Sequence, residues 1–190
     1  MTEKELTEGL KNKEPDAFRF LVESSKGLVY NTVLGILLNP EDAEDVAQEV
    51  FIQVYESIGS FKSEAKITTW LYRIAVTKSM DHLRKKKRKK RFAFMESLFN
   101  QNDELHHDPG HFIHPGVQLE HKEAAADLFK AIESLSENQR TAFVLNKLES
   151  LSYQEISEIM GITVSATDSL LHRAKNNLRK LLKYQYGQNN

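Results

Sequence analysis

The sequence predicts an all-α protein made of two small helical domains joined by a flexible linker. Its 190 residues include only 4 prolines and 8 glycines, and no Asn-Gly or Asp-Gly pair separates two alternating runs. Little material is therefore left for β-hairpins. Apolar residues recur instead at the 3.6-residue spacing of amphipathic helices along most of the chain.

A change in composition divides the chain near its middle. Residues 100–117 contain two prolines, two glycines and few apolar side chains, which is typical of a linker. We expect a first domain at residues 1–99, a linker at residues 100–118 and a second domain at residues 119–186. A length of 190 residues is sufficient for two such domains.

Composition also indicates the compartment. The chain has no cysteine, so it forms no disulfide and no thiolate metal site. No run approaches the roughly 20 apolar residues of a membrane-spanning helix, and the polar start MTEKELTEGL lacks the pattern of a signal peptide. We expect a soluble cytoplasmic protein without membrane insertion.

The first forty residues have a purely structural pattern. Leu6 and Leu10 lie on an otherwise polar helix, and Pro15 suits the first turn of a second helix. Apolar residues between Leu28 and Leu37 predict a further helix that ends near Asn39.

A sharply defined helix follows from Asn39, with Pro40 at its first position. Its apolar stripe is regular, and no base occurs from Glu41 to Glu56. An acidic helix face is often only solvated, but on a small protein with a strongly basic helix it repels DNA and favours a basic protein partner. The acids of that face are Glu41, Asp42, Glu44, Asp45, Glu49 and Glu56, with the amides Gln48 and Gln53 beside them.

The next segment combines aromatic and basic residues. Residues 61–91 carry twelve Lys or Arg and two acids, although the whole chain has a net charge of -1. A helix from Thr69 to about Arg88 places Leu71 and Ala75 on an apolar arc and Arg73 on a polar one. Aromatic faces beside cations suit stacking on unpaired bases, so we interpret this segment as a surface for opened nucleic-acid strands.

Two structural alternatives stand beside that interpretation. Trp70 lies at the seam between the two arcs and is also suited to core packing. The eight consecutive bases from Arg84 to Arg91 are also consistent with a solvated tail or a targeting signal.

Histidines are concentrated in and near the linker. A metal site there is one interpretation, because neutral imidazoles bind zinc or nickel, and a polar spacer is the other. Without cysteines or a fixed scaffold we assign no metal and no cofactor. The five histidines are His106, His107, His111, His114 and His121.

The C-terminal part has the pattern of a helix-turn-helix. A helix from near Leu119 to Leu135 precedes three more, and Ser136 with Gln139 and Ser152 with Glu155 both have the spacing of capping boxes. Gly161 is expected to end the helix that begins at Tyr153, and Ser165 with Asp168 is expected to begin the last helix.

An ordinary helical hairpin would give the same pattern, but the chemistry of the last helix favours DNA. It carries Arg173, Lys175 and further bases with no acid after Asp168. Ser165, Thr167 and Ser169 offer small polar groups in its first turn.

Three blocks in this order resemble a bacterial RNA polymerase sigma factor of the extracytoplasmic-function (ECF) group. They are AEDVAQEVFIQVY, FKSEAKITTWLYRIAVTKSMDHLRKKKR and the segment from LSENQRTAFVLNKLES to the final helix. The resemblance covers nearly all of the chain except the linker. It implies an N-terminal domain that binds the β′ clamp helices of polymerase core and opens the minus-ten promoter element, and a helix-turn-helix domain that binds the minus-thirty-five element.

The resemblance also implies residue roles, partners and regulation. The partners are RNA polymerase core, including the β flap, double-stranded and locally opened promoter DNA, and an anti-sigma factor. The clamp-binding residues are Asp42, Asp45, Gln48, Glu49 and Gln53. The downstream-element residues are Phe61, Lys62, Lys66, Trp70, Arg73, Thr77, Asp81, Arg84, Lys85 and Arg88. The upstream-element residues are Tyr153, Gln154, Ser165, Ala166, Thr167, Ser169, Leu170, Arg173 and Lys175.

Four positions depart from the family pattern. Thr77 replaces a common asparagine, Ser157 replaces a small alanine, and Asp168 and Leu170 stand where bases are frequent. The preferred bases are therefore not fixed by the resemblance.

Two other function classes remain as alternatives. A helix-turn-helix regulator that acts without replacing the polymerase specificity subunit accounts for the C-terminal half but gives the acidic and basic helices no shared purpose. A nucleic-acid enzyme or a metal-dependent phosphohydrolase would need its acids and histidines in one site, and here they occur in separate segments.

Overall fold

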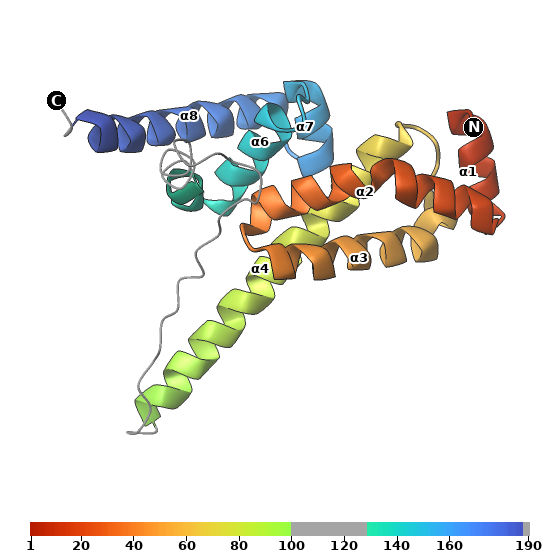
Figure 1. The fold of residues 1–190 in the computed structure, drawn as a ribbon. Helices are drawn as coiled ribbons and strands as arrows, with labels where there is room; N and C mark the ends of the chain where they lie inside the picture. The colour runs from red at the N-terminus through yellow and green to blue at the C-terminus, as the bar shows by residue number, and fades with distance from the viewer. Residues whose placement is uncertain (100–128, 188–190) are drawn as a thin grey trace, which may run out of the picture.

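The computed structural model describes residues 1–99 and 129–187, and their regular secondary structure is entirely helical (Figure 1). This confirms the all-α prediction. A short helical stretch at residues 129–133 precedes α6, whereas the predicted linker and the start of the helix expected near Leu119 lie outside the described residues. The N-terminal elements are α1 (Glu3–Lys11), α2 (Pro15–Leu37), α3 (Pro40–Ser57), the 3₁₀ turn η1 (Ile58–Ser60) and α4 (Ile67–Phe99). The C-terminal elements are α6 (Glu137–Lys147), α7 (Tyr153–Met160) and α8 (Val164–Gly187).

The N-terminal domain is a bundle in which α2, α3 and α4 pack on one another and α1 lies across the end of α2 (Figure 1). Their inner faces are fully buried: Val33 and Val50 have no exposed surface, and Leu71 and Ala75 bring the apolar arc of α4 into the same core. Burial of such side chains is the main source of stability, at about 1.5–3 kcal/mol for each large one.

Helix α2 is continuous, so the prediction of two separate helices before Asn39 was wrong. Gly27 and the neighbouring serines have low helix propensity, but tertiary packing of the buried face overrides it. The helix ends at Leu37, and the C-cap residue Leu38 adopts the left-handed conformation with φ 57° and donates its N–H to the Leu34 carbonyl.

The predicted start of α3 is confirmed. Asn39 accepts a hydrogen bond from the Asp42 backbone N–H at 2.8 Å, Pro40 occupies the first turn, and Glu41 and Asp42 lie at the positive end of the helix dipole.

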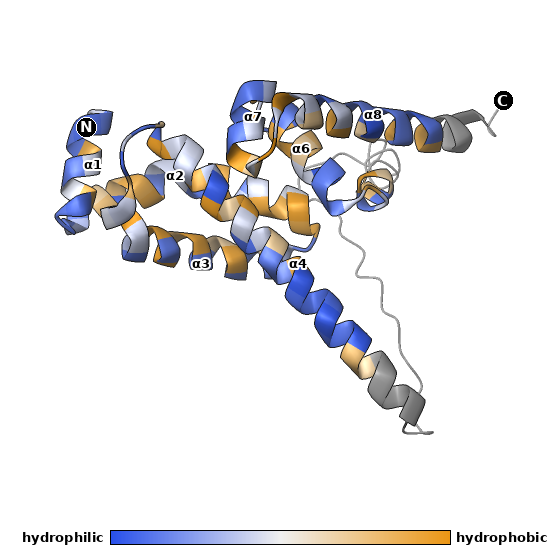
Figure 2. Ribbon diagram, turned by 180° about the vertical axis from the view of Figure 1, so that it is seen from behind, coloured by the Kyte–Doolittle hydropathy of each residue, from blue (hydrophilic) through white to orange (hydrophobic). Residues whose placement is uncertain are grey.

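Helix α4 is longer than the predicted span from Thr69 to Arg88. Its first N–H, that of Ile67, donates to the Glu3 carboxylate of α1 at 2.9 Å. Its C-terminal part projects away from the bundle and is hydrophilic along the basic run (Figure 2).

The helix caps of the C-terminal domain agree only in part with the sequence patterns. Ser152 and Glu155 form the reciprocal capping box at α7, as predicted. Ser136 is the N-cap of α6 but makes no side-chain capping bond. The prediction of a capping box at Ser136 and Gln139 was therefore wrong. Helix α8 begins at Val164, before Ser165, and Thr163 accepts the Ala166 N–H at 3.1 Å.

The two domains pack against each other over α2, α4, α6 and α7, and they share one hydrophobic core. Leu145 and Ile156 of the C-terminal domain belong to the same buried cluster as Leu71. At the edge of this contact the Tyr72 hydroxyl donates to Glu149 Oε2 at 2.8 Å. Burial, followed by the hydrogen bond to Glu149, raises the pKa of Tyr72 well above its usual range.

Substitution of Gly161 tests the backbone at the turn of the helix-turn-helix. Gly161 has φ 65° and a Cβ there would touch nothing, so Gly161→Ala adds only left-handed strain and should lower the free energy of unfolding by about 1–2 kcal/mol. Gly27→Ala, also in open space but inside α2, should raise it by up to about 1 kcal/mol. Urea unfolding measures both, and equal effects would contradict the assigned backbone conformation.

The raised pKa of Tyr72 predicts an alkaline loss of stability. The neutral phenol is favoured in the folded state, so its contribution is complete below a pH of about 10, the usual tyrosine value, and decreases as the pH rises further. The difference in unfolding free energy between the native chain and Tyr72→Phe should therefore shrink above that pH. An unchanged difference in urea unfolding at high pH would contradict this ionisation.

Candidate polymerase and nucleic-acid interfaces

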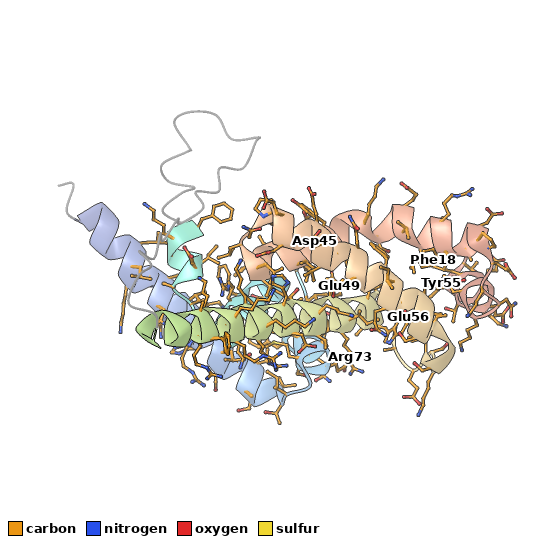
Figure 3. The ribbon with its side chains drawn as sticks, turned by 90° about the horizontal axis from the view of Figure 1, so that it is seen from below. Phe18, Asp45, Glu49, Tyr55, Glu56 and Arg73 are labelled. Carbon is orange, nitrogen blue, oxygen red and sulfur yellow. The ribbon has the colours of Figure 1, made fainter. Side chains whose placement is uncertain are left out.

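The outer face of α3 presents the acidic surface predicted from the sequence. Asp45, Gln48 and Glu49 are exposed, and Figure 3 shows Asp45, Glu49 and Glu56 along this helix beside α4. Glu49 lies 3.8 Å from the Lys78 ammonium of α4, and its side chain keeps half of its surface exposed. The acids are therefore only partly neutralised by the neighbouring basic helix.

Two of the predicted clamp-binding residues are less accessible to a partner protein than the others. Asp42 lies 3.2 Å from His82 Nε2 and also pairs with the Lys86 ammonium, and only 24% of its side chain is exposed. Gln53 is half-buried. The structure thus gives Asp42 a role in holding α3 against α4.

Beside the acids lies an apolar surface that the sequence interpretation missed. Ile52 is 58% exposed and Tyr55 is 43% exposed, both on α3. Tyr55 packs edge-on against Phe18 of α2, with 5.3 Å between ring centroids, and Lys13 Nζ lies 5.4 Å from the Tyr55 centroid. Ile52 and Tyr55 lie outside the buried stripe of α3 at a spacing of three residues. This spacing of two apolar residues on the polar face is the feature of the sequence that could have indicated the surface.

An aromatic pocket lies where η1 and the following loop meet the start of α4. Its volume is about 190 Å³. Phe61 is buried, and its ring centroid is 5.1 Å from that of Trp70, which is half-buried. The predicted stacking role of Phe61 therefore becomes a packing role, because the ring supports Trp70. The lining residues are Ser60, Phe61, Lys62, Glu64, Ala65, Thr69, Trp70 and Arg73.

This pocket has the composition that a single base would require. Lys62 and Arg73 supply positive charge, Ser60 and Thr69 supply hydroxyls, and Trp70 supplies an aromatic surface. Ser60, Glu64, Ala65 and Thr69 were not among the sequence-predicted residues. Glu64 and Ala65 lie in a loop, and loop positions carry no periodic signal.

The remaining downstream-element candidates lie on α4, except Lys66, which comes directly before the helix. The exposed ones are Lys66, Thr77, Arg84, Lys85 and Arg88. Asp81 accepts a hydrogen bond from Arg84 at 2.8 Å, so it orients that guanidinium. Arg73 differs from the others because its Nε donates to the Glu158 carbonyl of α7 at 2.9 Å.

The helix-turn-helix places most, but not all, of its candidates at the surface. Ser165 and Arg173 are exposed, and Ala166, Ser169 and Leu170 are half-buried. Thr167 has no exposed surface and its hydroxyl donates to the Thr163 carbonyl, so the prediction that it approaches DNA was wrong. Its short side chain lets the start of α8 pack closely on the domain.

Two candidates of α7 also have partners within the motif. Lys175 Nζ of α8 lies 3.4 Å from the Tyr153 hydroxyl, and Gln154 donates to the Glu158 carboxylate at 2.8 Å. Ser157 is buried and bonds the Gln154 carbonyl, so the serine fits where the family has a small residue.

Neither a metal site nor a membrane span is found in the described residues. They contain no group of three or more His, Asp or Glu side chains placed to hold a metal ion. The histidines of the predicted linker, His106 to His121, lie outside them. None of the helices within residues 1–99 and 129–187 is both long and apolar enough to cross a bilayer.

Comparison with known proteins identifies both domains. Residues 21–89 match the family described as Sigma-70 region 2, and residues 119–178 match Sigma-70, region 4. The chain is 33% identical to the ECF RNA polymerase sigma factor SigW of Bacillus subtilis, with 92% of this chain and 93% of SigW covered. It is 31% identical to the ECF RNA polymerase sigma-E factor of Escherichia coli K12, with 92% and 91% covered.

The fold has a solved counterpart over most of its length. The sigma factor RpoE of Bartonella quintana, solved in complex with the anti-sigma factor NepR, superposes with a TM-score of 0.70 at 21% identity. The superposition covers 87% of this chain and 96% of that one. With both sigma regions present in order and relatives matched over nearly their full length, the chain belongs to the ECF sigma factors, which direct RNA polymerase to promoters at the start of transcription.

Proposed function

We propose that this sigma factor binds RNA polymerase core through the outer face of α3 and opens promoter DNA with the adjoining face of α4. The observation that carries the proposal is the juxtaposition of two different surfaces on packed helices. One is acidic and apolar, and the other is basic and aromatic. As a sigma factor the chain is a specificity subunit and not an enzyme.

The chemistry of the α3 surface fits a protein partner. Exposed Ile52 and Tyr55 supply apolar area for the centre of an interface, and Asp45 and Glu49 supply charge at its edge. Such acids favour a basic partner and disfavour DNA, which agrees with the family expectation of the β′ clamp helices.

The chemistry of the α4 surface fits an unpaired base and its phosphates. Taking a base out of the DNA stack costs on the order of a few kcal/mol, and stacking on an aromatic ring returns about 1–3 kcal/mol. Trp70 supplies that ring, and Lys62 and the basic part of α4 supply phosphate contacts. Strand opening without ATP requires that these contacts recover the free energy of unstacking the base.

The C-terminal domain would bind the minus-thirty-five element as duplex. Ser165 and Arg173 are exposed on α8, and Ser169 and Leu170 are partly accessible beside them. We further propose contact with the β flap, a path of the linker toward the polymerase active site, and control by an anti-sigma factor in the cytoplasm. The Bartonella sigma factor was solved with such an inhibitor.

The assignment of α3 can be tested by reversing one exposed charge. Asp45→Arg should weaken binding to polymerase core at least about tenfold, because a like charge meets the basic partner. Glu23→Arg makes the same change on α2, where the side chain is 63% exposed, and should leave core affinity unchanged. Native mobility shift with core lacking its own specificity subunit measures both.

Equal losses for the two variants would show a general effect of charge and would contradict the α3 interface. Retention of core affinity by Asp45→Arg would remove that residue from it.

The assignment of the pocket can be tested at its rim. Lys62→Glu should lower permanganate reactivity of the downstream element at least about tenfold, while duplex binding in a gel shift falls much less. Lys4→Glu, on α1 with an 85% exposed side chain, is the matched control and should change neither measurement. Equal losses of opening and duplex binding by Lys62→Glu would contradict the opening role.

The function as a whole is tested by transcription. Polymerase core supplied with the native chain should give specific transcripts from chromosomal DNA of the host organism. Absence of any transcript above core alone would contradict the proposed function.

A further inference from the structure

The C-terminal part of α4 carries a basic surface, and most of its charge has no partner within the described residues. Every residue from Arg84 to Ala93 is exposed. Arg84, Lys86 and Lys87 each pair with an acid. The other bases of the run have neither an ion pair nor a side-chain hydrogen bond within residues 1–99 and 129–187. They are Lys85, Arg88, Lys89, Lys90 and Arg91.

One face of this part of α4 combines bases with an aromatic ring. Residues at positions i, i+3, i+4 and i+7 share a helix face, and here they are Lys85, Arg88, Lys89 and Phe92. Phe92 is 72% exposed, more than any other large apolar side chain in the described part of the chain. The face therefore offers three positive charges and one accessible ring to an external partner.

The same face lines a groove between α4 and α3, with a volume of about 1000 Å³. On the α3 side the groove contains Asp42, which pairs with Lys86, and Glu49, which lies 3.8 Å from the Lys78 ammonium. Positive charge therefore predominates, and the groove has room for anionic groups larger than a single phosphate. Its α4 side is lined by Lys85, Lys86, Arg88, Lys89, Arg91 and Phe92.

The position of this surface makes it accessible to a flat partner. The C-terminal part of α4 projects away from the helical bundle (Figure 1). Four of the last six residues of α4 are apolar, namely Phe94, Met95, Leu98 and Phe99. A polybasic run next to aromatic and apolar residues on one helix is the composition of segments that bind the surface of a bilayer.

Duplex DNA accounts for only part of this surface. Its phosphates attract Lys85 and Arg88, which are candidates for promoter binding. The bases of a duplex are stacked inside it and offer no place for the exposed ring of Phe92. A bilayer takes up such a ring in its interfacial region while its anionic headgroups attract the bases beside it. The combination therefore favours a membrane surface.

We propose that the basic run of α4 and Phe92 form a binding site for an anionic phospholipid bilayer. The bases contact lipid phosphates, and the Phe92 ring enters the headgroup region. Each base near an anionic surface strengthens binding about fivefold, and the attraction decays within about 10 Å at about 0.1 M salt. The contact is peripheral and needs no membrane-spanning helix. It depends on the charge and exposure of α4 and not on the proposed contacts with polymerase core or promoter DNA.

Flotation of the full chain with lipid vesicles tests the proposal. Vesicles with about 30% phosphatidylglycerol in phosphatidylcholine should bind the native chain at least about tenfold more tightly than vesicles of phosphatidylcholine alone. Raising the salt concentration should release the chain, because the headgroup charges are screened. Absence of binding to the anionic vesicles, or equal binding to both kinds, would overturn the proposal.

The aromatic part of the site is tested by Phe92→Ser. This variant should bind anionic vesicles at least about fivefold more weakly and bind duplex and single-stranded oligonucleotides as the native chain does. Phe20→Ser removes a 42% exposed ring from the N-terminal half of α2 and should change neither measurement. Equal losses of vesicle and oligonucleotide binding by Phe92→Ser would identify a nucleic-acid surface and overturn the proposal.

The basic part of the site is tested by Lys89→Glu. Reversal of this charge should weaken binding to the anionic vesicles at least about fivefold. Lys4→Glu makes the same change on α1, where the side chain is 85% exposed, and should have little effect. Equal losses for the two variants would show that only net charge matters and would contradict a site on α4.

Transcription separates this site from the proposed function. With polymerase core, Phe92→Ser should give the same transcript yield as the native chain, which shows that the variant is folded. Loss of transcription together with vesicle binding would overturn the assignment of Phe92 to a separate membrane site. If the native chain binds anionic vesicles but gives no transcript, the proposed function fails and the membrane site stands.

Discussion

The structure depends on the burial of one arc of α4 by both domains. Leu71 and Ala75 are completely buried in a core that also contains Leu145 and Ile156 from the other half of the chain. Because that arc is fixed, the remaining faces of α4 are fixed too. Trp70 and Arg73 therefore face the pocket near the start of the helix, and the basic run follows further along it.

The position of α3 beside this rod sets the electrostatics of the molecule. Acidic side chains of α3 meet α4 at two places: Asp42 lies against His82 and the Lys86 ammonium, and Glu49 lies near the Lys78 ammonium. Such partly exposed pairs contribute little stability, typically below about 1 kcal/mol each. They join α3 to α4, so the acidic face of α3 and the basic part of α4 lie close together on the same domain.

The sequence was most informative where the signal is local. The cap at Asn39, the capping box at Ser152 and the break at Gly161 each follow from a few neighbouring residues, and the structure confirms all three as helix boundaries. The continuity of α2 and the burial of Thr167 were missed because packing decides them. The bond from Tyr72 to Glu149 joins residues 77 positions apart, and no local pattern indicates such a contact.

The same shared core also fixes how the two domains sit against each other. Separating the domains exposes Leu145 and Ile156 to water at about 1.5–3 kcal/mol for each large side chain, and it breaks hydrogen bonds worth about 1 kcal/mol each. The buried side chains therefore contribute more to the contact than the polar bonds at its edge. The polar bonds of Tyr72 and Arg73 have a directional role instead, because each joins one named donor to one acceptor of the other domain.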